Sequence, residues 1–102
     1  MVSPEVVFHP EAAQEYVEAL LWYGERGEQL REAFEQEVER ALRLIVASPD
    51  RWPRYGSRYR RLLVRRFPYM LVYLRQGSRL WIVAVAHGHR RPGYWRRRRV
   101  QE

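Results

Sequence analysis

The hydrophobic pattern changes once along the chain, from the spacing of helices in the first half to that of strands in the second. Within residues 11–23 and again within 28–47, apolar side chains recur every three or four positions, which predicts two amphipathic helices. Gly24 and Gly27 lie between these segments, so we expect an antiparallel helical hairpin. Such a hairpin cannot bury its apolar faces alone, and the rest of the chain must supply a sheet or a further helix.

The second half has the composition of a β-sheet. Residues 61–67, 69–75 and 79–87 are each rich in Val, Leu, Ile, Tyr or Trp. Gly77, between the last two segments, predicts a hairpin turn that makes them antiparallel neighbours. A short apolar run at 6–8, ended by a His-Pro pair, predicts one more strand before the first helix. The predicted order is β-α-α-β-β-β, which is an α+β fold.

The last predicted strand constrains the core. Residues 80–86 are apolar at almost every position, so this strand is expected to be central and covered on both faces. The helices cover one face, and something else must cover the second. On the first helix, Glu11, Glu15 and Glu18 fall on the side away from the apolar positions, where solvent is expected. We predict one helix–sheet core that contains Leu20, Phe34, Val38, Ile45, Val72, Ile82 and Ala84.

Charge is divided unevenly between the two halves. Residues 1–50 hold 4 Arg against 11 Asp and Glu, whereas residues 51–102 hold 15 Arg against a single Glu, so the halves carry −7 and +14. Clustered guanidinium groups bind oxyanions through paired hydrogen bonds and release counterions from phosphates, which predicts an acidic or polyanionic partner. The tail over 96–102 begins with four arginines and is open to two interpretations: a flexible, solvated end or an arm that contacts phosphate.

Composition excludes several function classes. Without cysteine there is no disulfide, thiol nucleophile or thiolate metal site. Without lysine there is no Schiff-base chemistry and no phosphate-binding loop of the kind that needs a lysine. At 102 residues we expect a single domain over 1–102. No apolar run reaches the roughly 20 residues that cross a bilayer, and the start lacks the layout of a signal peptide, so a cytoplasmic protein is expected.

The densest cluster of functional side chains follows the last strand. Imidazole moves protons near neutral pH, guanidinium neutralises a phosphate or its transition state, and Tyr and Trp stack on bases. Together these groups could cleave RNA without a metal. The alternative is structural: the histidine ends the strand, and the aromatic residues hold the tail against the core. The cluster consists of His87, His89, Arg90, Arg91, Tyr94, Trp95 and Arg96.

A metal site is not expected here. His87 and His89 lie two positions apart on an extended strand, which would place both imidazoles on one face. A zinc or magnesium site needs further carboxylate, imidazole or thiolate ligands, whereas the neighbouring residues are arginines that repel a divalent cation.

The order of motifs along the chain resembles the RelE/ParE toxin superfamily of type II toxin–antitoxin systems. The resemblance covers about residues 5–99 and implies both helices on one face of an antiparallel sheet, together with a cognate antitoxin that neutralises the toxin in a hetero-oligomer. It implies no cofactor. The motifs are Phe8-His9-Pro10-Glu11-Ala12, the glutamate-rich hairpin, Pro49-x-x-Trp52-Pro53, Arg65-Arg66-Phe67-Pro68-Tyr69 and the segment from His87 to Trp95.

The resemblance leaves the target open, because RelE-like members cleave mRNA in the ribosomal A site and ParE-like members poison DNA gyrase. RelE-like nucleases carry an arginine before the Leu-Val-Tyr of a strand, where this chain has Met70. Met70 cannot stabilise a phosphorane, although Arg65 on the neighbouring strand could replace the missing charge. We therefore favour a ParE-like or undetermined target over a metal-independent endoribonuclease.

Two sets of site residues follow from this resemblance. Candidate catalytic residues are Arg65, His87, His89, Arg90 and Tyr94. Candidate target contacts are Arg66, Arg91, Trp95 and Arg96. An acidic antitoxin segment, disordered when free, is expected to lie across the uncovered sheet face and the Arg90 region. A different hypothesis is a stand-alone nucleic-acid-binding module whose arginines only grip backbone phosphate.

Overall fold

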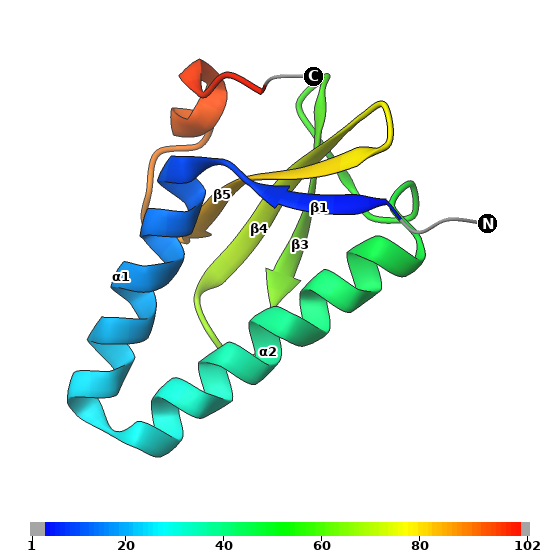
Figure 1. Ribbon diagram of the computed structural model, residues 1–102. Helices are drawn as coiled ribbons and strands as arrows, with labels where there is room; N and C mark the ends of the chain where they lie inside the picture. Colours follow the sequence, from blue (N-terminus) through cyan, green and yellow to red (C-terminus); the bar gives the residue numbers. More distant parts are fainter. Residues whose placement is uncertain (1–3, 101–102) are drawn as a thin grey trace.

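A computed structural model describes residues 4–100 and contains two long helices and one sheet (Figure 1). The helices are α1 (Pro10–Arg26) and α2 (Glu28–Ala47), and a 3-10 helix, η1 (Tyr94–Arg97), follows the sheet. The strands are β1 (Glu5–Phe8), β2 (Arg54–Tyr55), β3 (Tyr59–Val64), β4 (Tyr69–Gln76) and β5 (Arg79–His87). The predicted order is confirmed, with the short β2 as an addition. Within the described range, no helix is both long and apolar enough to cross a bilayer.

The five strands form one mixed sheet in the order β1-β5-β4-β3-β2. Strands β2 to β5 pair antiparallel as expected. In contrast, β1 lies parallel to β5, with Glu5 opposite Arg79 and Phe8 opposite Ile82. The expectation of a wholly antiparallel sheet is corrected in this respect, because the hydrophobic pattern identifies a strand but not its partner. The helical hairpin carries the chain from β1 to the far edge of the sheet, which leaves β5 as the neighbour of β1.

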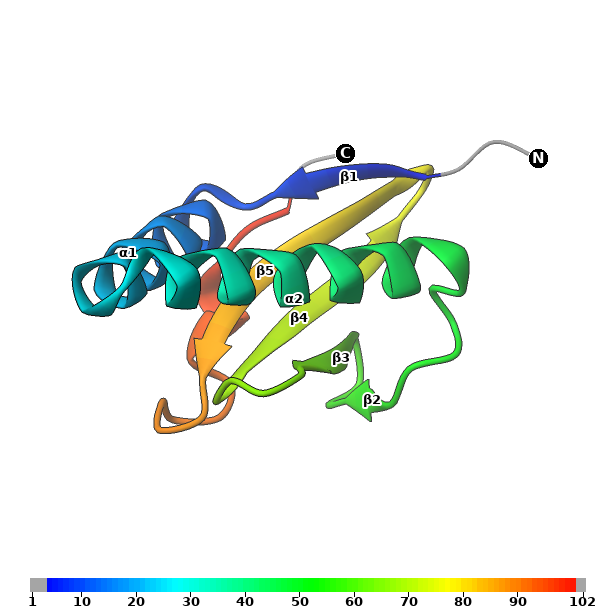
Figure 2. The ribbon, with the colours of Figure 1, turned by 90° about the horizontal axis from the view of Figure 1, so that it is seen from below.

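The helical hairpin is set by local capping. Pro10 opens α1, where its missing N–H costs nothing, and the Nδ1 atom of His9 accepts a 3.1 Å hydrogen bond from the amide of Glu11. The amide of Gly27 donates to the carbonyl of Tyr23 at 3.0 Å, and α2 begins at the next residue. Both helices cover the same face of the sheet, as expected (Figure 2).

Phe34 lies at the centre of the helix-side core and is completely buried. Four aromatic rings surround it, with centroids 4.9 to 6.0 Å from its own. They belong to Tyr16 and Tyr23 of α1, Phe67 of the β3–β4 turn and Tyr69 of β4. The ring therefore joins both helices to the sheet, and such edge and tilted arrangements add to the gain from burial alone.

The second face of the sheet is covered by the chain's own C-terminal segment. Trp95 of η1 is 1% exposed and packs in a second core with residues of β4 and β5. Its ring lies 5.0 Å from that of Tyr55 and 6.2 Å from that of Tyr59. Residues 94–100 thus cover β4 and β5 on the face that was expected to bind an antitoxin. Packing Trp95 there removes both the indole and the apolar side chains of the sheet from water.

Two residues of the predicted core, Val72 and Ala84, lie on the second face instead, and a β-bulge explains the position of Ala84. Val72 pairs with Ala84 and Tyr73 pairs with Ile82, so Val83 is an extra residue in β5. The bulge interrupts the alternation of faces, and Ile82 faces the helices while Ala84 lies with Val72 in the second core. Phe34, Val38, Ile45 and Ile82 are confirmed in the helix-side core, and Leu20 packs against it partly buried.

Truncating Phe34 should destabilise the fold. Phe34→Ala is expected to lower the free energy of unfolding by about 3–5 kcal/mol, because it removes a buried ring and leaves a cavity among four others. Urea denaturation followed by circular dichroism measures this. Val17→Ala is the control, since Val17 is 46% exposed on α1 and should cost under about 0.5 kcal/mol. Equal losses for the two variants would contradict the assignment of the core.

Candidate target-binding site

The end of β5, the middle of α1 and the C-terminal segment meet at the carboxylate of Glu15. Its Oε1 accepts hydrogen bonds from the amide of Val85 at 2.9 Å and from Nη1 of Arg98 at 2.9 Å. Its Oε2 accepts from the hydroxyl of Tyr94 at 2.7 Å and from Nη2 of Arg98 at 2.8 Å. The Glu15 and Arg98 side chains are only 14% and 8% exposed. This is a bidentate, largely buried ion pair.

The position of Glu15 follows from the shortness of β1. On the edge of β5 that faces β1, the last backbone hydrogen bond is donated by the amide of His9 to the carbonyl of Ile82, at 2.9 Å. Beyond that point β5 has no strand on this edge among the described residues, and its backbone groups need other partners. The carbonyl of Val83 accepts from Arg98 at 2.9 Å, and the amide of Val85 donates to Glu15. Two side chains therefore continue the edge where the strand ends.

The Glu15 carboxylate is stabilised in its charged form. Burial by itself would raise the pKa of this carboxyl, but hydrogen bonds from Arg98, Tyr94 and the Val85 amide outweigh burial, and its pKa is lowered. Tyr94 shows the opposite effect, because burial and the bond to Glu15 raise the pKa of its phenol. Tyr94 thus keeps its proton and donates a hydrogen bond to Glu15, which makes it a poor general base.

Arg90 is the most accessible member of this group. Its guanidinium carbon lies 3.9 Å from the centroid of the Tyr94 ring, and Nη1 lies 3.9 Å from Oε2 of Glu15. The Arg90 side chain is 55% exposed. Stacking on Tyr94 orients the guanidinium while leaving part of it free for a partner.

His87 and His89 form a pair at the end of β5. Their ring centroids lie 5.0 Å apart, and the amide of His89 donates to Nδ1 of His87 at 3.0 Å. That bond leaves the neutral imidazole of His87 with its proton on Nε2. The ring of Tyr69 meets His87 edge-on at 5.0 Å. His87 and Arg90 line one small hollow of about 110 Å³ together with Glu15, Glu18 and Tyr69.

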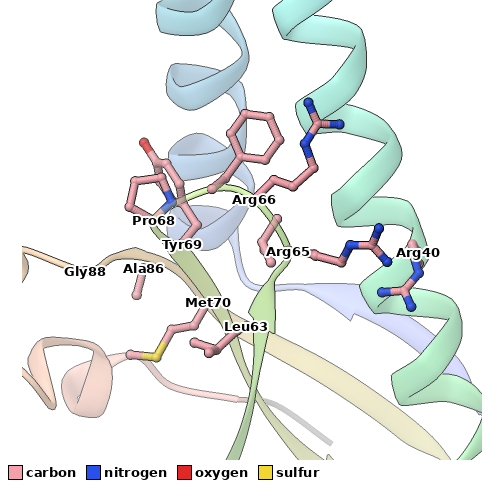
Figure 3. Close-up of a pocket in the computed structure, with 11 residues that line it drawn as sticks. Arg40, Leu63, Arg65, Arg66, Pro68, Tyr69, Met70, Ala86 and Gly88 are labelled. Carbon is pink, nitrogen blue, oxygen red and sulfur yellow. The ribbon is translucent and has the colours of Figure 1, made fainter.

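A second, larger hollow lies at the turn between β3 and β4 (Figure 3). It measures about 860 Å³, and its apolar part includes Leu63, Met70 and Ala86. Leu63 is 69% exposed, which is unusual for a leucine in a strand. We call this hollow the apolar groove.

Arginines form one rim of the apolar groove. Arg65 and Arg66 come from the turn and Arg40 from α2, and Figure 3 shows all three side chains on the α2 side of the groove. Arg66 has a φ of 73°, in the left-handed region that non-glycine residues rarely adopt. The groove thus combines an apolar floor with positive charge.

The structure distributes the sequence-predicted residues over several places. His87, Arg90 and Tyr94 meet around Glu15, with His89 beside His87. Arg65 and Arg66 line the apolar groove instead. Arg91 is exposed in the loop after β5, and Arg96 lines a further hollow described below. Trp95 is buried in the second core and holds the C-terminal segment against the sheet, as in the structural alternative, so its ring is not accessible to a target.

Sequence reasoning missed the residue that organises this site. Glu15 was expected to face solvent with Glu11 and Glu18, because the helical pattern places all three opposite the apolar positions. Helix α1 packs against the open edge of β5, so the flank of the helix is buried as well as its apolar face. No pattern along the sequence distinguishes Glu15 from its neighbours, since its partners lie 70 and 83 positions away.

The charges around the hollow limit its chemistry. Among residues 4–100, no group of three or more His, Cys, Asp or Glu side chains is placed to hold a metal ion. Two carboxylates, Glu15 and Glu18, line the same hollow as His87 and Arg90. Glu15 is neutralised by Arg98, but Glu18 takes part in none of the ion pairs found among residues 4–100, so a scissile phosphate would meet like charge from the Glu18 carboxylate. The exposed part of the Arg90 guanidinium is better suited to donate hydrogen bonds to acceptor groups on a partner protein.

A family model for the ParE toxin of the type II toxin–antitoxin system parDE matches residues 6–92. The chain belongs to this ParE toxin family. The match covers both helices and the five strands except Glu5, the first residue of β1, and it includes Glu15, His87 and Arg90. As a type II toxin of this family, the protein has a cognate antitoxin as partner. Curated proteins provide no further match. Residues 93–100 of this ParE-family toxin, with η1 and the arginines that follow it, lie beyond the matched segment.

Removing the Glu15 carboxylate should weaken the fold and change its dependence on pH. Glu15→Ala leaves Arg98 without its partner in a largely buried position, which is expected to cost about 3–5 kcal/mol. Folding lowers the pKa of Glu15 below its ordinary value of 4.5, so its contribution is present above pH 4.5 and is lost as the pH falls further. Urea denaturation at pH 7 and at pH 3 measures both effects.

The matched control is Glu32→Ala on the exposed side of α2. It should cost under about 0.5 kcal/mol at either pH. A Glu15→Ala variant as stable as the control at pH 7 would contradict the ion pair. A difference between the variants that persists unchanged at pH 3 would contradict its ionic character.

Proposed function

We propose that this toxin arrests bacterial growth in the cytoplasm by binding an essential target in the ParE-like manner, with DNA gyrase as the leading candidate. The observation that carries the proposal is the composition of the hollow at the end of β5. Glu15 and Glu18 stand beside His87 and Arg90 there. The Glu18 carboxylate opposes the approach of a phosphodiester, whereas an exposed arginine stacked on Tyr94 suits contact with a protein surface.

The competing RelE-like activity, ribosome-dependent mRNA cleavage, is less well supported. It needs positive charge at the position of Met70, and Met70 lines the apolar groove. Arg65, the possible substitute, also lines that groove and not the hollow of His87 and Arg90. Loss of one preorganised charge at a phosphoryl transition state typically costs about a hundredfold to a thousandfold in rate. Tyr94 is committed to Glu15 as well.

The apolar groove is our candidate for antitoxin binding. Beyond its pairing with β2 at Tyr59 and Arg60, the outer edge of β3 has no strand partner among residues 4–100. An extended antitoxin segment could add a strand there, place apolar side chains over Leu63 and direct acidic ones to the arginine rim. Leu63, Met70 and Ala86 are cross-strand neighbours, so the proposed contact uses the part of the second face that residues 94–100 leave open, next to the edge of β3.

Expression of the toxin alone should arrest growth of a bacterial host, and co-expression of its antitoxin should restore growth. Arg90→Ala should weaken the arrest, because it removes the exposed contact group of the hollow. Arg43→Ala, on the exposed side of α2, is the matched control. Normal growth with abundant folded toxin would exclude the toxic function, and equal weakening by both variants would exclude a specific role for Arg90.

Two assays distinguish the targets. Purified toxin should inhibit supercoiling by gyrase, with Arg90→Ala less effective, and should leave ribosome-bound mRNA intact. Codon-phased cleavage that is abolished by Arg90→Ala or His87→Ala would establish the RelE-like activity instead. Nucleic-acid binding without growth arrest or effect in either assay would favour the stand-alone binding module.

Leu63 provides the test of the antitoxin site. Leu63→Asp should weaken antitoxin binding by at least about a hundredfold, because it removes an apolar anchor and places a charge in the interface. Isothermal titration calorimetry with purified antitoxin measures the affinity. Leu21→Asp is the control, since Leu21 is also exposed, at 63%, but lies on α1. A loss confined to Leu21→Asp would place the antitoxin on the helices and contradict our assignment.

A further inference from the structure

The C-terminal segment and the turn before β3 border an open hollow of about 530 Å³ that is lined almost wholly by arginine. We call it the arginine hollow. Arg58 comes from the turn, residues 96–99 supply four arginines, and Val100 completes the lining. Lining segments that lie far apart along the chain are thus brought together by folding.

Most of this charge is not compensated within the protein. Arg98 is paired with Glu15 and Glu11. Within the described part of the chain, by contrast, no ion pair engages Arg58, Arg96, Arg97 or Arg99. All four are exposed. Neighbouring like charges destabilise a compact fold, so such a cluster is typical of a surface that binds an anion.

The backbone that carries these arginines is held in place. The amide of Arg98 donates to the carbonyl of Trp95 at 2.9 Å, and the amide of Arg96 donates to that of Gly93 at 3.1 Å. The buried side chain of Trp95 and the ion pair of Arg98 with Glu15 anchor the backbone next to Arg96, Arg97 and Arg99. Arg96, Arg97 and Arg99 are therefore presented from an anchored segment and lose less freedom on binding than arginines of a free tail.

Two glycines make room for the side chain of Arg96. A Cβ atom at Gly93 would lie 3.1 Å from Nε of Arg96, and one at Gly56 would lie 3.4 Å from its Nη2. The Arg96 side chain therefore lies close to both the turn before β3 and the start of η1. Arg96 thus reaches the turn that carries Arg58, and both side chains line the same hollow.

The aromatic residues nearby indicate which anion fits. Proteins that bind single strands stack bases on exposed aromatic rings. Here Trp95 is buried and its ring packs against those of Tyr55 and Tyr59. No free ring remains among these three for base stacking. Guanidinium groups alone contact phosphate without regard to sequence, which is the mode used on duplex backbones.

We propose that the arginine hollow binds the phosphate backbone of a nucleic-acid duplex, at a site separate from the hollow of His87 and Arg90. Arg58, Arg96, Arg97 and Arg99 supply the phosphate contacts, and Arg98 holds the segment through Glu15. Four of the five arginines lie beyond the segment that matches the ParE family. Duplex binding of this kind is a property of the isolated toxin and does not depend on the identity of its target.

The test measures binding of a fluorescently labelled DNA duplex of about 20 base pairs by anisotropy over a series of salt concentrations. Each arginine that contacts a phosphate contributes about one unit to the slope of log K against log salt. Arg58→Gln/Arg97→Gln should therefore make that slope less steep by about two units. The control is Arg43→Gln/Arg75→Gln, which removes the same charge from exposed positions outside the hollow and should change the slope by less than about half a unit.

Several results would overturn the proposal. Equal changes for the two double variants would mean that the duplex is attracted only by net charge. Tighter binding of a single strand of the same length than of the duplex would mean that bases, not a duplex backbone, are recognised. Undetectable duplex binding at about 50 mM salt would exclude the site altogether. Circular dichroism of both variants verifies that they are folded, and the assay does not involve toxicity or antitoxin.

Discussion

The ion pair between Glu15 and Arg98 determines more of this structure than any other single contact. It completes the edge of β5 where β1 ends, and it fixes the C-terminal segment across the sheet so that Trp95 closes the second core. It also sets the position of Tyr94, on which Arg90 stacks. A buried ion pair is weak evidence for stability in itself. Here its effect is geometric, because it joins a helix, a strand and the chain's end at one carboxylate.

The architecture could be predicted from the sequence because it depends on local signals. Helix spacing, the glycine turn after α1 and the run of β-branched residues each specify an element, and residues 28–47 proved to be a helix with those bounds. What the sequence could not specify was pairing. The parallel partner of β1 and the bulge at Val83, which turns Ala84 to the second face, depend on tertiary contacts that leave no mark on local hydrophobicity.

The site was predictable in part for the same reason. His87 and Arg90 were identified because a dense polar cluster follows a hydrophobic strand. Glu15 was missed, because a glutamate on a helix flank is ordinarily solvated and its burial depends on residues far along the chain. Arg65 was grouped with Arg90 by motif, yet it lines a separate hollow, since the β3–β4 turn directs it toward α2. Arginines that the motifs grouped together thus line three separate surfaces: Arg65 the apolar groove, Arg90 the hollow beside Glu15, and Arg96 the arginine hollow.

The pairing of the chain's two ends has a consequence for synthesis. β1 pairs with β5, and Glu15 bonds to Arg98, so the first elements translated need the last ones as partners. Contacts over such separations form late, and β1 and Glu15 cannot reach these partners while residues 79–98 remain in the ribosomal exit tunnel. The hollow that holds Arg90 is therefore completed only after the segment up to Arg98 has left the tunnel. During synthesis, an antitoxin would thus meet a toxin whose Arg90 surface is not yet assembled.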